Sequence, residues 1–199
     1  MLQTPQDNAI TIAEEDQWRL LSYRLLARLL AAAPNQAVLN VLQTVSKQTT
    51  ETAISQAWRS LAQAARETDP ALVKQEYDAV FIGFTSGEVI PYASSYLTGF
   101  LMEKPLARLR QDLLDCGIQR QQSVCEPEDH IAAVLEAMSL LIESSDQRQW
   151  AFFIRHIQPW SCRFFNDLQQ AVSADFYQAV ARFGAAFIEL ETMLLSLEQ

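Results

Sequence analysis

The sequence predicts an all-α fold, in the form of a single globular helical domain of roughly nine helices. Apolar residues recur at helical spacing along most of the 199-residue chain, whereas no alternating run typical of a strand has a useful length. Proline, glycine and capping residues divide this pattern at short intervals. Because 49% of the residues are apolar, the chain can form a substantial core.

The N-terminal third contains three predicted helices. Residues 11–14, Thr-Ile-Ala-Glu, form a capping box before a first helix that ends at Pro34. Apolar residues at i, i+3, i+4 and i+7 from Val38 to Val45 predict the second helix. Apolar positions from Ile54 to Ala65 predict a third, which closes near Asp69-Pro70.

The middle of the chain alternates helices with two connectors. Asp69-Pro70 is a start signal for a fourth helix that carries Tyr77 and Phe81, and glycines and a proline then mark a loop over 83–91. We expect the next helix to run from Tyr92 to Gly117 with a bend at Pro105, followed by a polar connector over 118–125.

Four further helices are predicted after residue 130. An apolar stripe at 131–142 predicts the first, and aromatic positions at 150–157 predict a second that ends before Pro159. A third helix covers 164–172, and Ser173 is the expected N-cap of a last helix over 176–197.

Residues 1–199 are expected to form a single domain. If that domain is divided into two subdomains, segments 83–91 and 118–125 are the expected hinges. The same hinges would permit helix exchange, so both a monomer and a helix-exchanged dimer are compatible with the sequence.

Composition narrows the range of partners. The net charge of −9 disfavours nucleic acid and favours a basic peptide. No apolar run reaches the ~20 residues of a membrane span, so no stable membrane insertion is expected. The N-terminus has no signal-type apolar core, which predicts a cytoplasmic location. Three cysteines fit reduced thiols, and His130 and His156 lack zinc-site spacing, so no metal or other cofactor is expected.

The segment Glu126-Pro127-Glu128-Asp129-His130 combines three carboxylates with one of two histidines. A helix start explains Pro127 at the first helical position and the acids near the positive helix end. It leaves His130 unexplained, because that end disfavours a cation. Glu126 and His130 would share a helical face and form a charge-assisted hydrogen bond. No nucleophile accompanies the cluster, so no catalytic residue is assigned.

Two pairs of aromatic residues lie four positions apart, Tyr77 with Phe81 and Tyr92 with Tyr96. Each pair shares a helical face and indicates either an aromatic core or a binding surface. Residues 83–88 contain two glycines, but they lack the Lys-Ser/Thr ending of a phosphate loop and therefore indicate a turn.

Three segments together resemble the TorD/DmsD family of redox-enzyme maturation chaperones. They are 77–83 (YDAVFIG), 90–97 (IPYASSYL) and 126–130 (EPEDH), in the order and separation that the family shows. Val80 stands where the family usually has Leu. Because both residues are apolar, this difference would affect the shape of the pocket and not the membership of the family.

The resemblance implies a cytoplasmic, system-specific chaperone of a molybdopterin-dependent oxidoreductase of the DMSO reductase type. Such a chaperone binds the twin-arginine leader and the apo-enzyme, and it aids cofactor insertion and proofreading before Tat export. The carboxylates of Glu126 and Asp129 would meet the arginines beside an apolar groove. The leader-binding residues implied by motif are Tyr77, Val80, Phe81, Pro91, Tyr92, Ser94, Tyr96, Glu126, Pro127, Asp129 and His130.

Two other classes of protein remain open at this point. One is a small metal-dependent helical hydrolase that uses Glu126, Asp129 and His130. The other is a structural interaction subunit that binds one folded partner. The motifs do not name the client enzyme, and no nucleotide loop accompanies the guanine nucleotide binding linked to some family members.

Overall fold

The computed structural model describes residues 14–44, 51–83, 86–121 and 124–197, and it confirms the all-α prediction. These residues form ten α-helices and two π-helical segments, with no strand among them. Because α4 continues into η1, and α8 continues through η2 into α9, the described part of the chain contains nine continuous helices. None of its helices is both long and apolar enough to cross a membrane.

The elements follow one another along the chain with short connections. They are α1 (Glu14–Ala31), α2 (Gln36–Gln43), α3 (Ala53–Glu67), α4 (Pro70–Tyr77), η1 (Asp78–Ile82), α5 (Ala93–Thr98), α6 (Lys104–Asp115), α7 (Ile131–Glu143), α8 (Gln149–Phe152), η2 (Phe153–Ile157), α9 (Gln158–Gln170) and α10 (Phe176–Leu197).

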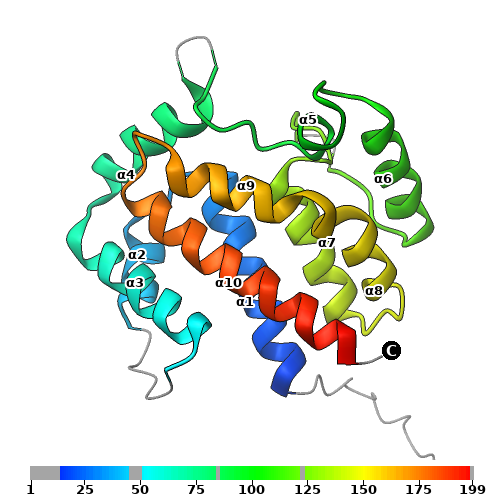
Figure 1. Cartoon of the computed structure of the whole chain (residues 1–199), viewed down its shortest axis with the longest axis horizontal. Coiled ribbons are helices and arrows are strands. Elements are labelled where there is room, and N and C mark those ends of the chain that lie inside the picture. Colours follow the sequence, from blue (N-terminus) through cyan, green and yellow to red (C-terminus); the bar gives the residue numbers. More distant parts are fainter. Residues whose placement is uncertain (1–13, 45–50, 84–85, 122–123, 198–199) are drawn as a thin grey trace, which may run out of the picture.

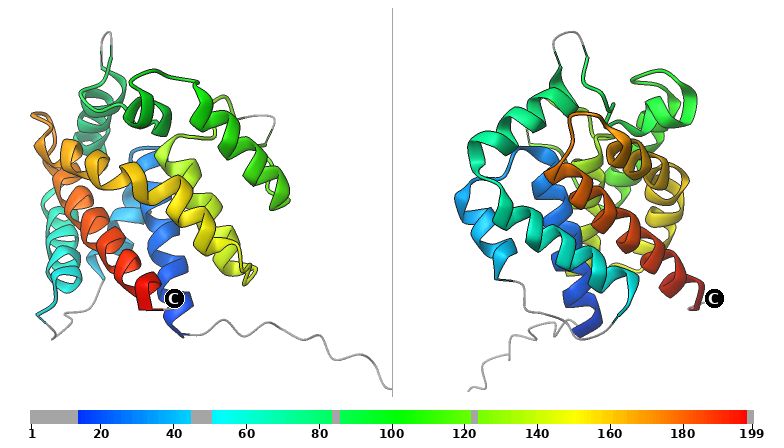
Figure 2. Two further views of the ribbon diagram at one scale, coloured as in Figure 1. Left: turned by 45° about the vertical axis from the view of Figure 1, so that its right-hand side comes forward. Right: turned by 60° about the vertical axis from the view of Figure 1, so that its left-hand side comes forward.

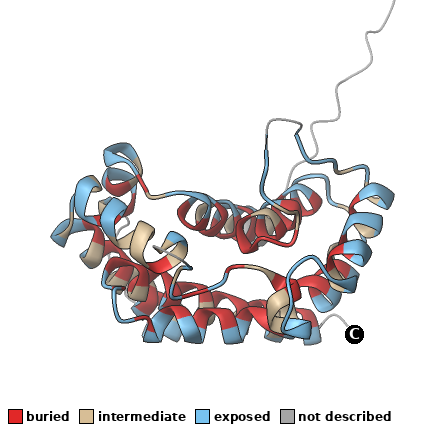
Figure 3. Cartoon of the chain, turned by 90° about the horizontal axis from the view of Figure 1, so that it is seen from above, coloured by how far each residue is buried: buried red, intermediate tan, exposed pale blue. Residues whose placement is uncertain are grey.

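Helices α1 and α10 form the centre of the molecule (Figure 1). Helix α1 packs against α7, while α10 packs against α9 and α3. Helices α2 and α3 lie at one side, and α5 and α6 lie at the other, where α5 packs against α9 (Figures 1 and 2). The buried residues, coloured red along the ribbons in Figure 3, form one core cluster to which both halves of the chain contribute.

The contact between α9 and α10 depends on a glycine. A Cβ atom at Gly184 would lie 2.1 Å from a ring carbon of Phe165, whose side chain is fully buried. The absence of a side chain on α10 therefore lets the Phe165 ring of α9 approach the α10 backbone. Around this contact the core is largely aromatic, with Phe164, Phe183 and Phe187 also fully buried.

Two predicted helix boundaries in the second half of the chain are wrong. The helix expected from Tyr92 to Gly117 is two helices, because Gly99 adopts a left-handed φ of 82° that ends α5, and Pro105 lies in the first turn of α6. The break expected before Pro159 is absent. The wider π turns of η2 precede this proline, and the Trp160 indole N–H donates to the His156 carbonyl at 2.7 Å.

The predicted capping residues had mixed outcomes. Asp69 caps α4 with Pro70 in its first turn, as expected. Ser173 does not precede α10 directly. The carboxylate of Glu76, on α4, instead accepts hydrogen bonds from the amides of Asp175, Phe176 and Tyr177 at 2.6–3.1 Å. A side chain distant in sequence thus satisfies the start of α10. The capping box at 11–14 lies largely outside the described residues.

The segments predicted as hinges, 83–91 and 118–125, are non-helical wherever they are described. Glu88, in the first segment, accepts hydrogen bonds from the amides of Val172 and Ser173 at 2.7 and 3.2 Å, so this loop contacts the turn between α9 and α10. A hinge function of either segment stays a prediction.

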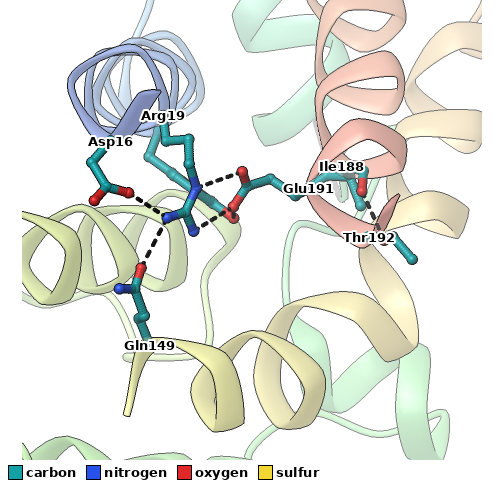
Figure 4. Close-up of polar contacts among 7 residues, drawn as sticks. Asp16, Arg19, Gln149, Ile188, Glu191 and Thr192 are labelled. Atoms are coloured by element: carbon teal, nitrogen blue, oxygen red, sulfur yellow. Dashed lines mark hydrogen bonds and ion pairs between the residues drawn. The ribbon is translucent and has the colours of Figure 1, made fainter. Parts of the chain in front are cut away.

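A buried ion pair links α1 to α10 (Figure 4). The Arg19 guanidinium donates to both carboxylate oxygens of Glu191, at 2.7 and 3.0 Å, and Glu191 is fully buried. Arg19 also donates to Asp16 and Gln149, and the Tyr23 hydroxyl donates to Glu191 at 2.9 Å. The two charges are therefore compensated by a dense network, as burial requires.

Replacing Arg19 with Met should lower the free energy of unfolding by about 3–5 kcal/mol, because it leaves the Glu191 charge buried and unpaired. Adding Glu191→Gln to that variant should recover part of the loss, although the same change destabilises the wild type. Urea unfolding measures all three variants. Arg24→Met is the control, because its ion pair with Glu143 is exposed and should contribute less than about 1 kcal/mol. Additive effects of the two substitutions would contradict this role of the pair.

Candidate functional site

The segments around residues 92 and 130 are joined by backbone hydrogen bonds. Tyr92 and His130 form an isolated antiparallel bridge, in which the Ile131 amide donates to the Pro91 carbonyl at 2.8 Å. The Ala93 amide donates to the Asp129 carbonyl at 2.9 Å. Two of the three motifs that carry the family resemblance are therefore in direct contact.

Asp129 adds a side-chain contact to this bridge. One of its carboxylate oxygens accepts the backbone N–H of Ser94 at 2.9 Å, in the first turn of α5, where Tyr92 makes no side-chain cap. Asp129 is 1% exposed and Ser94 is fully buried. Asp129 therefore performs for α5 the task of an N-cap residue, although it lies 35 positions away in sequence.

His130 is the N-cap of α7, and this corrects the predicted helix start. The helix begins at Ile131, so Pro127, Glu128 and Asp129 form a turn before it. The His130 Nδ1 atom accepts the Ala132 amide at 3.2 Å, which requires that nitrogen to carry no proton. Burial lowers the pKa of His130, against the opposing charges of Glu126 and Asp129. A neutral histidine carries no positive charge, so the positive end of the α7 dipole does not disfavour it.

Glu126 contacts Tyr92 and not His130. The Tyr92 hydroxyl donates to a carboxylate oxygen of Glu126 at 2.5 Å, while Glu126 itself is exposed. Burial, and then this hydrogen bond, raise the pKa of Tyr92 above its ordinary value. The expected Glu126–His130 pair is absent because the turn before α7 is not helical.

The third motif, residues 77–83, lies close enough to Glu126 and Tyr92 for electrostatic interaction with them. Burial raises the pKa of Tyr77, and the negative charge of Glu126 raises it further. The Tyr77 hydroxyl donates to the Ala31 carbonyl at 3.0 Å, at the end of α1. The Tyr77 ring contacts Phe81 and Tyr177 with centroid distances of 5.0 and 5.8 Å. The pair Tyr77 and Phe81 therefore joins the core on one side and remains half-exposed on the other.

The remaining predicted residues of this region lie deeper or elsewhere. Val80 and Pro91 are buried, and Pro127 is half-buried. Tyr96 turns toward α9, where its hydroxyl donates to Asp167 at 2.9 Å and its ring contacts Trp160 at a centroid distance of 5.5 Å. Tyr92 and Tyr96 therefore have different neighbours, although they are four residues apart.

Sequence reasoning missed the partners of Glu128. Its carboxylate pairs with Arg110 of α6 at 2.8 Å and with Arg120 at 3.4 Å. Burial would raise the pKa of Glu128, but its hydrogen bonds and these cations lower it overall. Arg120 also donates to the carbonyls of Val124 and Glu126, so it anchors the connector. Nothing in the local sequence identifies these pairs, which join separate segments.

The geometry does not gather Glu126, Asp129 and His130 into one centre. Each side chain has a different partner, respectively Tyr92, Ser94 and Ala132. Among the described residues, no group of three His, Cys, Asp or Glu side chains is placed to hold a metal ion. The arrangement is that of a braced surface carrying one exposed carboxylate beside half-exposed aromatic rings.

Comparison with known proteins identifies the class. The family model described as nitrate reductase delta subunit matches residues 47–166, more than half of the chain. The chaperone protein TorD of Shewanella pealeana is 28% identical over 92% of each chain. The "probable Tat proofreading chaperone DmsD" of Haemophilus influenzae is 31% identical, and its match spans 55% of each chain. Both relatives are named as chaperones and not as enzymes.

A solved structure shows the same fold. It is provisionally named a redox enzyme maturation protein of Archaeoglobus fulgidus, and it matches with a TM-score of 0.57 and 19% identity. The match covers 94% of this chain and 99% of that one.

The chain belongs to the TorD/DmsD family of redox-enzyme maturation chaperones, which confirms the resemblance of its motifs.

The role of His130 predicts a pH dependence of stability. A lowered pKa in the folded state means that the unfolded chain takes up the proton first as the pH falls. The stability contributed by the neutral cap is therefore present above the ordinary histidine pKa and is lost as the pH falls through the folded-state value. Asn at this position keeps a capping acceptor but cannot be protonated. Between about pH 7 and pH 5, the free energy of unfolding of His130→Asn should fall less steeply than that of the wild type.

Urea unfolding across this pH range measures the difference between the two proteins. His156, whose pKa burial also lowers, is present in both and cancels in the comparison. Parallel pH profiles would show that protonation of His130 does not affect folding.

Proposed function

We propose that this chain is a cytoplasmic, system-specific chaperone that binds the twin-arginine leader and the apo-form of a molybdopterin-dependent oxidoreductase of the DMSO reductase type. In this function it aids cofactor insertion and proofreads the enzyme before Tat export. The observation that carries the proposal is the exposed Glu126 carboxylate, which Tyr92 orients beside the aromatic pair Tyr77 and Phe81. A twin-arginine leader joins cations to an apolar segment, and this surface offers both complements.

We propose that some of the predicted residues contact the peptide and that the others position them. Glu126, Tyr92, Tyr77 and Phe81 are exposed or half-exposed, so they are proposed to contact the peptide. The buried residues Val80, Pro91, Ser94, Asp129 and His130 are proposed to hold them in place. Tyr96 and Pro127 are half-buried and are also proposed to have positioning roles, because the Tyr96 hydroxyl is bound to Asp167 of α9 and the Pro127 carbonyl accepts the His130 amide. Asp129 in particular has its carboxylate bound to a buried amide, so Glu126 is the better partner for a leader arginine.

Two exposed apolar side chains extend the proposed surface. Ile82 directly follows Phe81 and is 60% exposed, while Ile90 directly precedes Pro91 and is 43% exposed. Both lie within the motif segments 77–83 and 90–97, at the two ends of the 83–91 loop. We infer that these two residues extend the apolar contact for the leader.

A structural interaction subunit is the remaining alternative. It would bind one folded partner and would not prefer a twin-arginine peptide to a scrambled one. A pull-down against a panel of twin-arginine leaders from the same cell separates the two functions, and it also names the client enzyme.

Glu126→Gln should weaken binding of the cognate leader by about tenfold, because a charge-assisted acceptor for an arginine is lost. Tyr92→Phe should weaken it less, since the carboxylate remains but is no longer oriented. Affinity should also fall as salt rises. Fluorescence anisotropy with a labelled leader peptide measures each effect.

The matched control is Glu136→Gln, which makes the same charge change at an exposed position of α7. It should bind the leader nearly as the wild type does. If Glu126→Gln and Glu136→Gln bind equally well, Glu126 does not contact the arginines. If the wild type binds a scrambled peptide equally well, the chain is not a leader-specific chaperone.

A further inference from the structure

A cavity of about 380 Å³ opens between α5, α6 and the junction of η2 with α9. Leu97, Pro105, Leu109 and Pro159 form its apolar wall. All of the ionisable side chains that line it are basic, and no carboxylate of the described residues lines it. This differs from the larger cavity between α3 and α10, which includes Glu67 and Asp175 beside its arginines.

The basic wall of the cavity consists of Lys104, Arg108 and Arg155, with His156 beside them. The Arg155 guanidinium and the His156 Nε2 atom both contact Asp112, at 2.8 and 2.6 Å. Lys104 and Arg108 form no hydrogen bond or ion pair with any described residue. The excess positive charge of the cavity therefore comes from these two side chains.

The placement of these two cations is electrostatically unfavourable by itself. Lys104 and Arg108 are four residues apart on α6, so they share a helical face, where like charges repel. Lys104 is also the first residue of α6, near the positive end of the helix dipole. Glu103, the N-cap residue, makes no side-chain hydrogen bond that would satisfy this helix end. A bound anion would relieve both effects.

We propose that this cavity binds a small organic phosphate, with the phosphate group between Lys104 and Arg108 and the organic part against Leu97 and Leu109. Lysine supplies a point charge for phosphate and arginine a bidentate donor. The apolar wall distinguishes an organic phosphate from inorganic phosphate. The volume lies within the range of small-molecule sites. The inference does not depend on leader binding.

Isothermal titration of the full chain with phenyl phosphate, in a phosphate-free buffer, tests the proposal. We expect saturable binding with one site per chain, and weaker binding of inorganic phosphate, which cannot use the apolar wall. The double variant Lys104→Gln with Arg108→Gln should bind phenyl phosphate at least about tenfold more weakly. Both side chains are exposed, so this variant should fold, and the loss of repulsion should leave its thermal midpoint unchanged or raised.

The control is Arg24→Gln with Arg182→Gln, which makes the same change in net charge at exposed positions outside the cavity. It should bind phenyl phosphate within about twofold of the wild type, since distant charges are screened at physiological salt. Equal losses in the two double variants would overturn the site, as would the absence of saturable binding. Vesicles of phosphatidylglycerol present the same group on a lipid. Binding to vesicles without binding to phenyl phosphate would also overturn the proposal.

Discussion

The junction between residues 91–94 and 129–131 is the contact on which the candidate site depends. Helices α5 and α7 both begin there, and each start is satisfied by groups from this junction. The Asp129 carboxylate and carbonyl accept the first amides of α5, while the Pro91 carbonyl accepts the Ile131 amide. Because these groups are buried, leaving any of them unpaired would cost free energy comparable to a lost hydrogen bond. The junction therefore fixes Tyr92 close to Glu126.

Similar links between distant segments recur through the fold. Glu76 of α4 satisfies the first amides of α10, and Arg19 of α1 pairs with Glu191 of α10. An all-helical chain has no sheet to register its elements, and apolar packing alone tolerates repacking. Buried polar contacts between helices supply a more specific geometry, since each one is satisfied in a single arrangement.

Local signals in the sequence were sufficient to predict most helices and to identify the three motifs. Asp69-Pro70 starts α4, and the stripe at 131–142 lies within α7, because these features depend on neighbouring residues. The split between α5 and α6 was missed because apolar spacing continues across Gly99. The cap of α10 by Glu76 and the neutral state of His130 depend on residues brought together by folding, so sequence spacing could not reveal them.

The distribution of charge within the site follows from these pairings more than from composition. Of the three carboxylates in residues 126–130, Asp129 is buried on an amide and Glu128 is paired with two arginines. Glu126 is exposed, and it accepts a hydrogen bond from the Tyr92 hydroxyl. Because this hydroxyl is neutral, the hydrogen bond does not compensate the negative charge of Glu126. A net charge of −9 would attract a basic peptide to the whole surface. The fold adds to this general attraction one oriented carboxylate beside aromatic rings. In the proposed function, that arrangement is what would distinguish a leader from other cations.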